Sequence, residues 1–186
     1  DGRVIRLPNV KMTHDPLAIT TKDEVTAYSL TDIDAINPEP WMLGEGHHWT
    51  GSMIFALELQ SGNTDKQEID LDLNSVWRQS EVRYTLRVSG ELDEANETIT
   101  SDDYSVTAKS GRFLSDTTYA GANLYFEADK FAHLKRRNMF SAYYGKQWYS
   151  KPQFSLSTEP GLGYVSESRT ELEQQNYFAF SWNMDM

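Results

Sequence analysis

The chain has 186 residues, enough for one sizeable domain, and its formal net charge of −11 argues against a nucleic-acid partner. Cysteine is absent, which excludes disulfides and thiolate chemistry. Mean hydropathy is −0.61, and no apolar run approaches the ~20 residues of a membrane helix. Membrane strands remain compatible with these values, because they are apolar only at alternate positions.

Residues 1–46 are predicted to form a small β module and a linker. The runs "RVIRL" and "LAITTKDEVTAYSLTDI" have β-like composition and are interrupted by Pro8, Asn9 and Pro16. The string "SLTDIDAI" could instead be one helical turn capped by Ser29 or Thr31. The linker is expected around residues 37–46, in "NPEPWMLGEG".

From His47 onward, apolar residues recur at every second position, which predicts β-strands. About eight strands are expected, near residues 50–60, 68–77, 81–92, 104–109, 119–127, 138–149, 153–162 and 177–184. Several are about ten residues long, whereas strands of soluble sheets usually have ~5–6 residues. Tilted membrane strands need ~9–11 residues, so the lengths favour a membrane protein.

The predicted connections alternate in length. Short turns are expected at 78–81, 115–118 and 149–152, and longer polar loops at 93–102, 129–137 and 166–175, with 61–65 on the long-loop side. This alternation is typical of outer-membrane barrels. We therefore predict that residues 47–186 form an all-β, up-and-down antiparallel transmembrane β-barrel. The alternative is an ordinary soluble sheet with its charged face in water.

Charged residues occupy the positions between the apolar ones, so a barrel would carry them on its inner wall. This predicted lumen charge ladder consists of Glu58, Asp70, Asp72, Arg83, Arg87, Lys109, Glu127 and Glu159. Charges in a dry interior are very unfavourable, so these must be paired or in water. A turn centred between residues 79 and 80 would place Asp72 opposite Arg87 and Val76 opposite Arg83.

Two further groups of residues suggest contacts with a membrane. The string "KFAHLKRR" contains Lys130, Lys135, Arg136 and Arg137, which could contact lipopolysaccharide phosphates from an extracellular rim. Its alternative is a solvated loop. Near predicted strand ends lie Trp49, Trp77, Trp148 and Tyr149, which are predicted to anchor the sheet at the membrane interfaces. Their alternative is packing in a core.

No catalytic residue, metal site or cofactor is predicted. Adjacent residues of a strand point to opposite faces, so His47 and His48 are poorly placed to chelate one metal. The string "DLDLN" lacks the glycine and final glutamate of an EF-hand loop. His14 and His133 are the other histidines, and the chain has no Gly-x-Ser-x-Gly motif. We therefore expect a non-enzymatic protein.

Three segments, in order, resemble a known family. They are "WTGS" followed by "SGNTD", then "YFEADKFAHLKRR", and finally "EPGLGYVSE". Together with the linker "LTDIDAINPEP", they resemble the YdiY-like family of bacterial outer-membrane proteins, described as salt-induced and as a domain of unknown function. The chain departs from the family at Lys130, where the family has arginine.

The resemblance implies the outer membrane of a Gram-negative bacterium, with the N-terminal module in the periplasm. Its implied partners are outer-membrane lipid, lipopolysaccharide and another envelope protein. The family's barrel usually continues for several strands after the equivalent of Trp182, whereas this chain ends in "NMDM". We therefore expect part of a roughly twelve-stranded barrel rather than closure at eight strands.

The expected function is that of a narrow channel, a structural protein or a scaffold for an envelope complex. The alternative is a soluble β-sandwich or lipocalin-like barrel that binds a carbohydrate or small ligand.

Overall fold

The computed structural model of the chain describes residues 11–12, 18–20, 25–27, 37–151, 153–170 and 172–186. The chain divides into two compact units, Asp1–Glu39 and Pro40–Met186. In the first unit, β1 (Lys11–Met12), β2 (Ala18–Thr20) and β3 (Val25–Ala27) form an antiparallel sheet in the order β1-β2-β3. The helical turn considered for "SLTDIDAI" lies outside the described residues.

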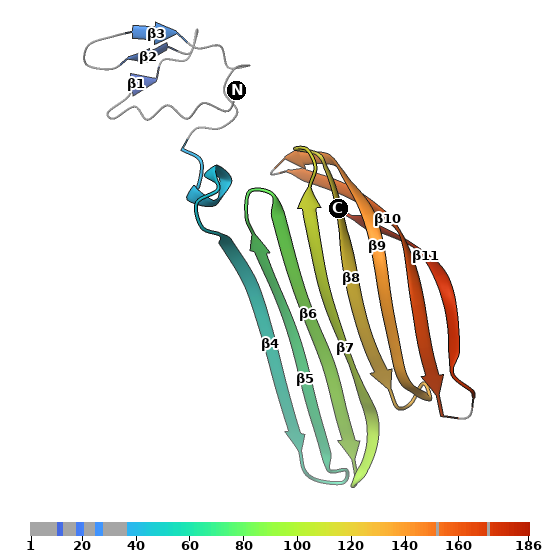
Figure 1. Cartoon of the computed structure of the whole chain (residues 1–186). Helices are drawn as coiled ribbons and strands as arrows, with labels where there is room; N and C mark the ends of the chain where they lie inside the picture. Colours follow the sequence, from blue (N-terminus) through green and yellow to red (C-terminus); the bar gives the residue numbers. More distant parts are fainter. Residues whose placement is uncertain (1–10, 13–17, 21–24, 28–36, 152, 171) are drawn as a thin grey trace. The chain divides into compact units, whose positions relative to one another are not determined.

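The second unit begins with a 3-10 helix, η2 (Pro40–Leu43), and continues as one sheet (Figure 1). Its strands are β4 (His48–Gln60), β5 (Lys66–Arg78), β6 (Val82–Ala95), β7 (Thr98–Phe113), β8 (Thr118–Asp129), β9 (Leu134–Lys151), β10 (Phe154–Arg169) and β11 (Gln175–Asp185). Strands that follow each other in the chain pair antiparallel, which makes an eight-stranded up-and-down sheet, as predicted. Within the described residues β4 and β11 each pair with one strand, so the sheet is not closed.

The strands are 11 to 18 residues long. Short turns follow β5, β7 and β9 as predicted, but the predicted long loops are wrong. Segment 93–102, predicted as a loop, lies in β6 and β7, which are joined through Asn96 and Glu97. Both residues have positive φ, 47° and 62°, as in the type I′ turns that match strand twist. Segments 129–137 and 166–175 are likewise shortened by β9, β10 and β11. Polar residues extend these strands because the backbone ladder satisfies their N–H and C=O groups whatever the side chain.

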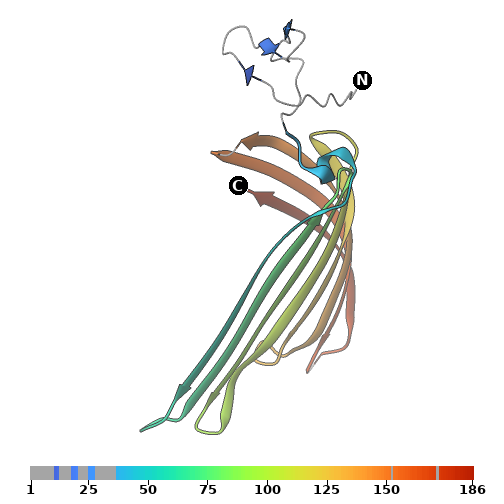
Figure 2. The same ribbon diagram turned by 90° about the vertical axis from the view of Figure 1, so that its left-hand side faces the viewer.

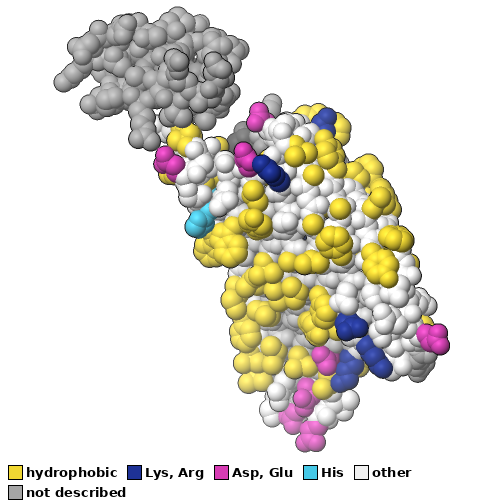
Figure 3. All heavy atoms as spheres, viewed as in Figure 1, with side chains coloured by type: hydrophobic (Ala, Val, Ile, Leu, Met, Phe, Trp, Pro, Cys, Tyr) yellow, Lys and Arg dark blue, Asp and Glu magenta, His cyan; other side chains and the backbone are white. Residues whose placement is uncertain are grey.

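The register sorts the side chains onto two faces. Residues directly opposite each other across the sheet point to the same side, and successive residues of a strand alternate. One face, here called the outer face, carries the row of Trp49, Trp77 and Tyr84 on β4 to β6. The other, the inner face, carries Asp70 and Glu91 in the corresponding positions of β5 and β6. Apolar side chains gather over the face shown in Figure 3, with charged side chains near its lower end.

The sheet is bent, as Figure 2 shows, and a contact between distant strands identifies the inner face as the concave one. Arg83 on β6 has its Nη2 3.6 Å from Oε1 of Glu159 on β10, although three strands lie between them. In a flat sheet these two strands would be about 19 Å apart, at ~4.8 Å for each step. The two side chains can therefore meet only because the inner face is concave.

Glycine on the inner face makes room for large rings. A Cβ on Gly145 of β9 would overlap the ring of Tyr119, which lies opposite it on β8. Tyr119 itself is completely buried. The absent side chain therefore allows the tyrosine ring to lie flat against the sheet.

No helix among the described residues is long and apolar enough to cross a membrane.

Gly145→Ala is expected to destabilise the sheet by about 1–3 kcal/mol, because overpacking displaces the ring of Tyr119. The midpoint of thermal unfolding of the full-length protein measures this change. Gly62→Ala is the control, since a Cβ there meets no atom within 4 Å. Equal midpoints for the two variants would contradict the role assigned to Gly145.

We define the near end of the sheet as the end at which β4 begins, and the far end as the end at which β4 stops. The turns that join β5 to β6, β7 to β8 and β9 to β10 lie at the near end. The connections after β4, β6, β8 and β10 lie at the far end.

Candidate functional site

The register places all eight residues of the predicted charge ladder on the inner face, on strands β4 to β10: Glu58, Asp70, Asp72, Arg83, Arg87, Lys109, Glu127 and Glu159. They do not form one continuous ladder. Two of them, Arg83 and Lys109, meet a third, Glu159, and Glu127 joins a second cluster. The other four form no ion pair within the described residues: Glu58, Asp70, Asp72 and Arg87. The inner face therefore has regions in which the charges are paired and regions in which they are not.

The first cluster, here called the Glu159 cluster, consists of Arg83, Lys109, Tyr119 and Glu159. Glu159 is 1% exposed. Its carboxylate accepts a hydrogen bond from the Tyr119 hydroxyl at 2.8 Å and forms an ion pair with Lys109. Arg83 lies 3.6 Å from the same carboxylate. A buried carboxylate without partners is strongly unfavourable, so these groups from β6, β7 and β8 make its position on β10 tolerable.

Aromatic rings fill the space around the Glu159 cluster. The Lys109 ammonium lies 4.6 Å from the centre of the Tyr143 ring, and the Arg83 guanidinium 4.9 Å from that of Tyr119. The Tyr143 hydroxyl donates a hydrogen bond of 3.0 Å to the carbonyl oxygen of Ser110. Cations held over ring faces in this way gain electrostatic attraction in addition to their ion pairs. The inner face is therefore packed with side chains here.

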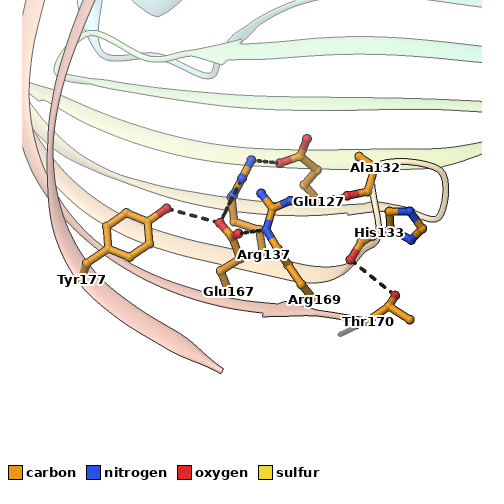
Figure 4. Close-up of polar contacts among 8 residues, drawn as sticks. All are labelled: Glu127, Ala132, His133, Arg137, Glu167, Arg169, Thr170 and Tyr177. Carbon is orange, nitrogen blue, oxygen red and sulfur yellow. Dashed lines mark hydrogen bonds and ion pairs between the residues drawn. The ribbon is translucent and has the colours of Figure 1, made fainter. Parts of the chain in front are cut away.

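The second cluster, here called the Glu167 cluster, consists of Glu127, Arg137, Glu167, Arg169 and Tyr177 (Figure 4). Glu167 is 5% exposed and accepts hydrogen bonds from Arg137 Nε at 2.9 Å and Arg169 Nε at 2.5 Å. The Tyr177 hydroxyl donates to it at 3.3 Å. Arg137 also pairs with Glu127 at 2.7 Å, so one guanidinium links β8, β9 and β10.

Three members of this cluster were missed from the sequence: Glu167, Arg169 and Tyr177. Glu167 and Arg169 fall in segment 166–175, which is predicted as a loop, and the sequence predicts no partner for Tyr177. A usable signal was present, since Glu167 stands eight residues after Glu159 and therefore shares its face in a continuous strand.

The predicted pairing of Asp72 with Arg87 is wrong. Asn74 lies opposite Arg87, Asp72 lies opposite Ser89, and Val76 lies opposite Thr85. The turn is centred one residue later than predicted, where the Gln79 N–H donates to the Val82 carbonyl at 2.8 Å. A shift of one residue in the turn centre moves every opposite pair by two positions. Asp72, Asn74, Arg87 and Ser89 instead line part of a hollow of about 260 Å³.

Carboxylates face one another across the far end of the inner face. One row runs across four strands and consists of Asp70, Glu91, Asp103 and Asp129. The next row holds Glu58, Glu68 and Asp93. Like charges directly opposite each other are destabilising, and without water the cost would be prohibitive. This region therefore needs solvent. The described residues contain no cluster of three or more ligands arranged to hold a metal ion.

The four basic residues predicted for a rim do not form one patch. Lys130 lies in the connection between β8 and β9 and is 3.7 Å from Asp102. Arg136 is on the outer face of β9, opposite Ser168, whereas Arg137 points inward into the Glu167 cluster. Lys135 is exposed at the start of β9. The predicted loop 129–137 is wrong because β9 already begins at Leu134.

The four aromatic residues predicted as interfacial anchors lie near one end of the sheet. Trp49 lies opposite Trp77 on the outer face. Trp148 and Tyr149 lie near the end of β9, which is also at the near end. About half of each side chain is exposed, so none of the four is packed in a core of the described residues.

Comparison with known proteins gives one family and one relative. The family model described as "Protein of unknown function, DUF481" matches residues 54–186. The uncharacterized protein YdiY of Escherichia coli (strain K12) is 24% identical over 131 residues, which cover 67% of this chain and 52% of that protein. The chain thus spans about half the length of this curated relative. No solved structure matches the chain.

Glu159→Gln is expected to lower the free energy of unfolding by about 3 kcal/mol, because Lys109 and Arg83 lose their shared counter-ion. Glu81→Gln is the control. Its pair with Arg112, at 3.1 Å, is exposed and should contribute only about 0–1 kcal/mol. Denaturant unfolding of the full-length protein compares the two, and similar losses would contradict a special role for Glu159.

Proposed function

Since this chain belongs to the DUF481 family, whose function is unknown, we propose its role from its two faces: the sheet is part of a β-barrel in the outer membrane of a Gram-negative bacterium. The family resemblance seen in the sequence is confirmed by the match over residues 54–186. The observation that carries the proposal is an exposed apolar outer face on the same strands that bear a charged inner face.

The outer face exposes more apolar side chains than is usual for a protein surface in water. Large side chains along β4 and β11 are more than half exposed: Met53, Phe55, Leu57, Leu59, Phe180 and Trp182, with Phe178 reaching 84%. Soluble monomers rarely expose a contiguous apolar patch above a few hundred Å². The carboxylate rows of the inner face have the opposite requirement, since they need water. A sheet with lipid outside and water inside meets both requirements.

The edge of the apolar region is oblique to the strands. On β4 it extends to Leu59, ten residues beyond Trp49. The row through Trp49 reaches Phe180 on β11, and there the apolar region ends two residues further, at Phe178. Between β4 and β11, which are seven strand spacings apart, the position of the edge along the strands therefore shifts by eight residues. At ~3.4 Å per residue and ~4.8 Å per strand this is an angle of about 39°. Barrel strands in membranes tilt by ~35–45°.

Closure of such a barrel requires further strands. Open sheet edges are not tolerated in hydrocarbon, because their N–H and C=O groups would lack partners. We propose that additional strands of a roughly twelve-stranded barrel connect β11 to β4, with the N-terminal unit in the periplasm. The near end of the sheet then faces the periplasm, and the far end faces outward.

Within this barrel we propose a narrow channel or a structural scaffold rather than an enzyme. The Glu159 and Glu167 clusters fill the inner face of β8 to β10, which supports a restricted passage. The carboxylate rows of β4 to β8 support a water-filled space that attracts cations. At the outer end, Arg136 on the outer face suits contact with lipopolysaccharide phosphates.

Placement in a membrane is tested by adjacent substitutions on β4 of the full-length protein. Phe55→Lys puts a charge on the outer face and should abolish most of the folded form, at a cost of about 2–4 kcal/mol near the bilayer centre. Ala56→Lys puts the same charge on the inner face, opposite Asp70, and should be tolerated. Heat-modifiable gel mobility after detergent extraction of outer membranes measures the folded fraction.

Two results would overturn the membrane assignment. One is recovery of the wild-type protein from the soluble periplasmic fraction, which favours the soluble ligand-binding alternative. The other is equal tolerance of Phe55→Lys and Ala56→Lys, because a membrane discriminates between the faces and bulk water does not.

The channel role is tested in planar bilayers with the full-length protein. We expect a small conductance that prefers cations, and Asp70→Asn with Glu91→Gln should reduce this preference by removing two opposed carboxylates. Arg112→Gln, on the outer face, serves as the control. An unchanged preference after neutralisation of the row would argue against a passage along it, and absence of conductance would favour the scaffold role.

A further inference from the structure

An apolar groove lies on the outer face, close to the end of the sheet at which β4 begins. The proposed channel does not involve this groove. Its volume is about 490 Å³. Side chains of β9, β10 and β11 line it, including Tyr144, Lys146, Trp148, Leu156, Pro160 and Trp182. Ligand pockets commonly have volumes of ~300–1,000 Å³, so an extended apolar group can be accommodated.

Lys146 brings a positive charge into this groove. Its ammonium lies 4.3 Å from the centre of the Trp148 ring, and the indole N–H donates a hydrogen bond of 2.9 Å to Thr158 Oγ1. The ring beneath the ammonium is therefore fixed by its neighbour on β10. Within the described part of the chain, Lys146 forms no ion pair. The residues opposite it on β8 and β10 are Thr118 and Thr158, which are uncharged.

Two other cations with which it can be compared are already neutralised. Arg112 pairs with Glu81 at 3.1 Å at the near end, and Lys130 pairs with Asp102 at 3.7 Å at the far end. Lys146 thus differs from both in keeping its charge available to a ligand, next to an apolar wall and interfacial aromatic rings.

We propose that the groove binds one anionic phospholipid, with an acyl chain along the apolar wall and the phosphate at Lys146. The inference rests on the proposed membrane function and names a lipid site within it. Tryptophan and tyrosine favour the level of the headgroups, where the lysine stem covers apolar surface while its ammonium reaches a phosphate. Opposite charge selects a lipid with net negative charge over a zwitterionic one.

The test uses full-length protein in mild detergent, offered equal amounts of phosphatidylglycerol and phosphatidylcholine and analysed by native mass spectrometry. The wild-type protein should retain phosphatidylglycerol preferentially. Lys146→Gln should reduce that preference about fivefold, as expected for one basic residue near an anionic headgroup. Lys146→Arg should preserve it. Arg112→Gln should leave it unchanged, because that guanidinium is already paired with Glu81.

Each variant is first confirmed to be folded by heat-modifiable mobility. The lipid site is overturned if folded Lys146→Gln keeps the wild-type preference, or if Arg112→Gln loses as much, which would indicate a diffuse surface effect. Either result leaves the membrane proposal intact. Recovery of the wild-type protein as a soluble periplasmic species would overturn both proposals.

Discussion

The continuous antiparallel ladder from β4 to β11 is the constraint on which the rest of the structure depends. Because side chains alternate with a period of two, this ladder commits every residue to one of two faces. A slip of one residue in β5, for example, would move Asp70 and Asp72 to the apolar outer face. The segregation of apolar and charged residues onto opposite faces therefore specifies the register of the strands.

The bend of the sheet gives its inner face two kinds of region. On β10, Glu159 and Glu167 are buried. Glu159 is paired with groups from other strands, and Glu167 is paired with Arg137 and Tyr177 from the neighbouring strands and with Arg169 from its own strand. Across β4 to β8 the carboxylates of the far end oppose one another and need solvent. A partly filled and partly hydrated interior follows from these contacts, and it is the basis of the narrow channel that we propose.

The outer face indicates which surroundings suit the protein. Its apolar region is oblique to the strands, as a planar slab of lipid crossed by tilted strands would require. At the near end, this region ends in tryptophan and tyrosine side chains, and the groove at Lys146 lies among them. The aromatic side chains at the groove thus support our proposal for where the membrane interface lies, and Lys146 among them supports the class of lipid proposed for the groove.

The sequence alone was sufficient for the all-β class, the eight up-and-down strands and the common face of the charged residues, because alternation is a local property of each strand. It was insufficient for the partners of those charges. The Asp72–Arg87 pairing failed because one residue in a turn centre shifts every cross-strand pair. The loop at 93–102 was wrong because polar strands and polar loops have similar composition. Contacts such as Arg83 with Glu159 arise only from the curvature of the whole sheet, which brings together residues that no local pattern connects.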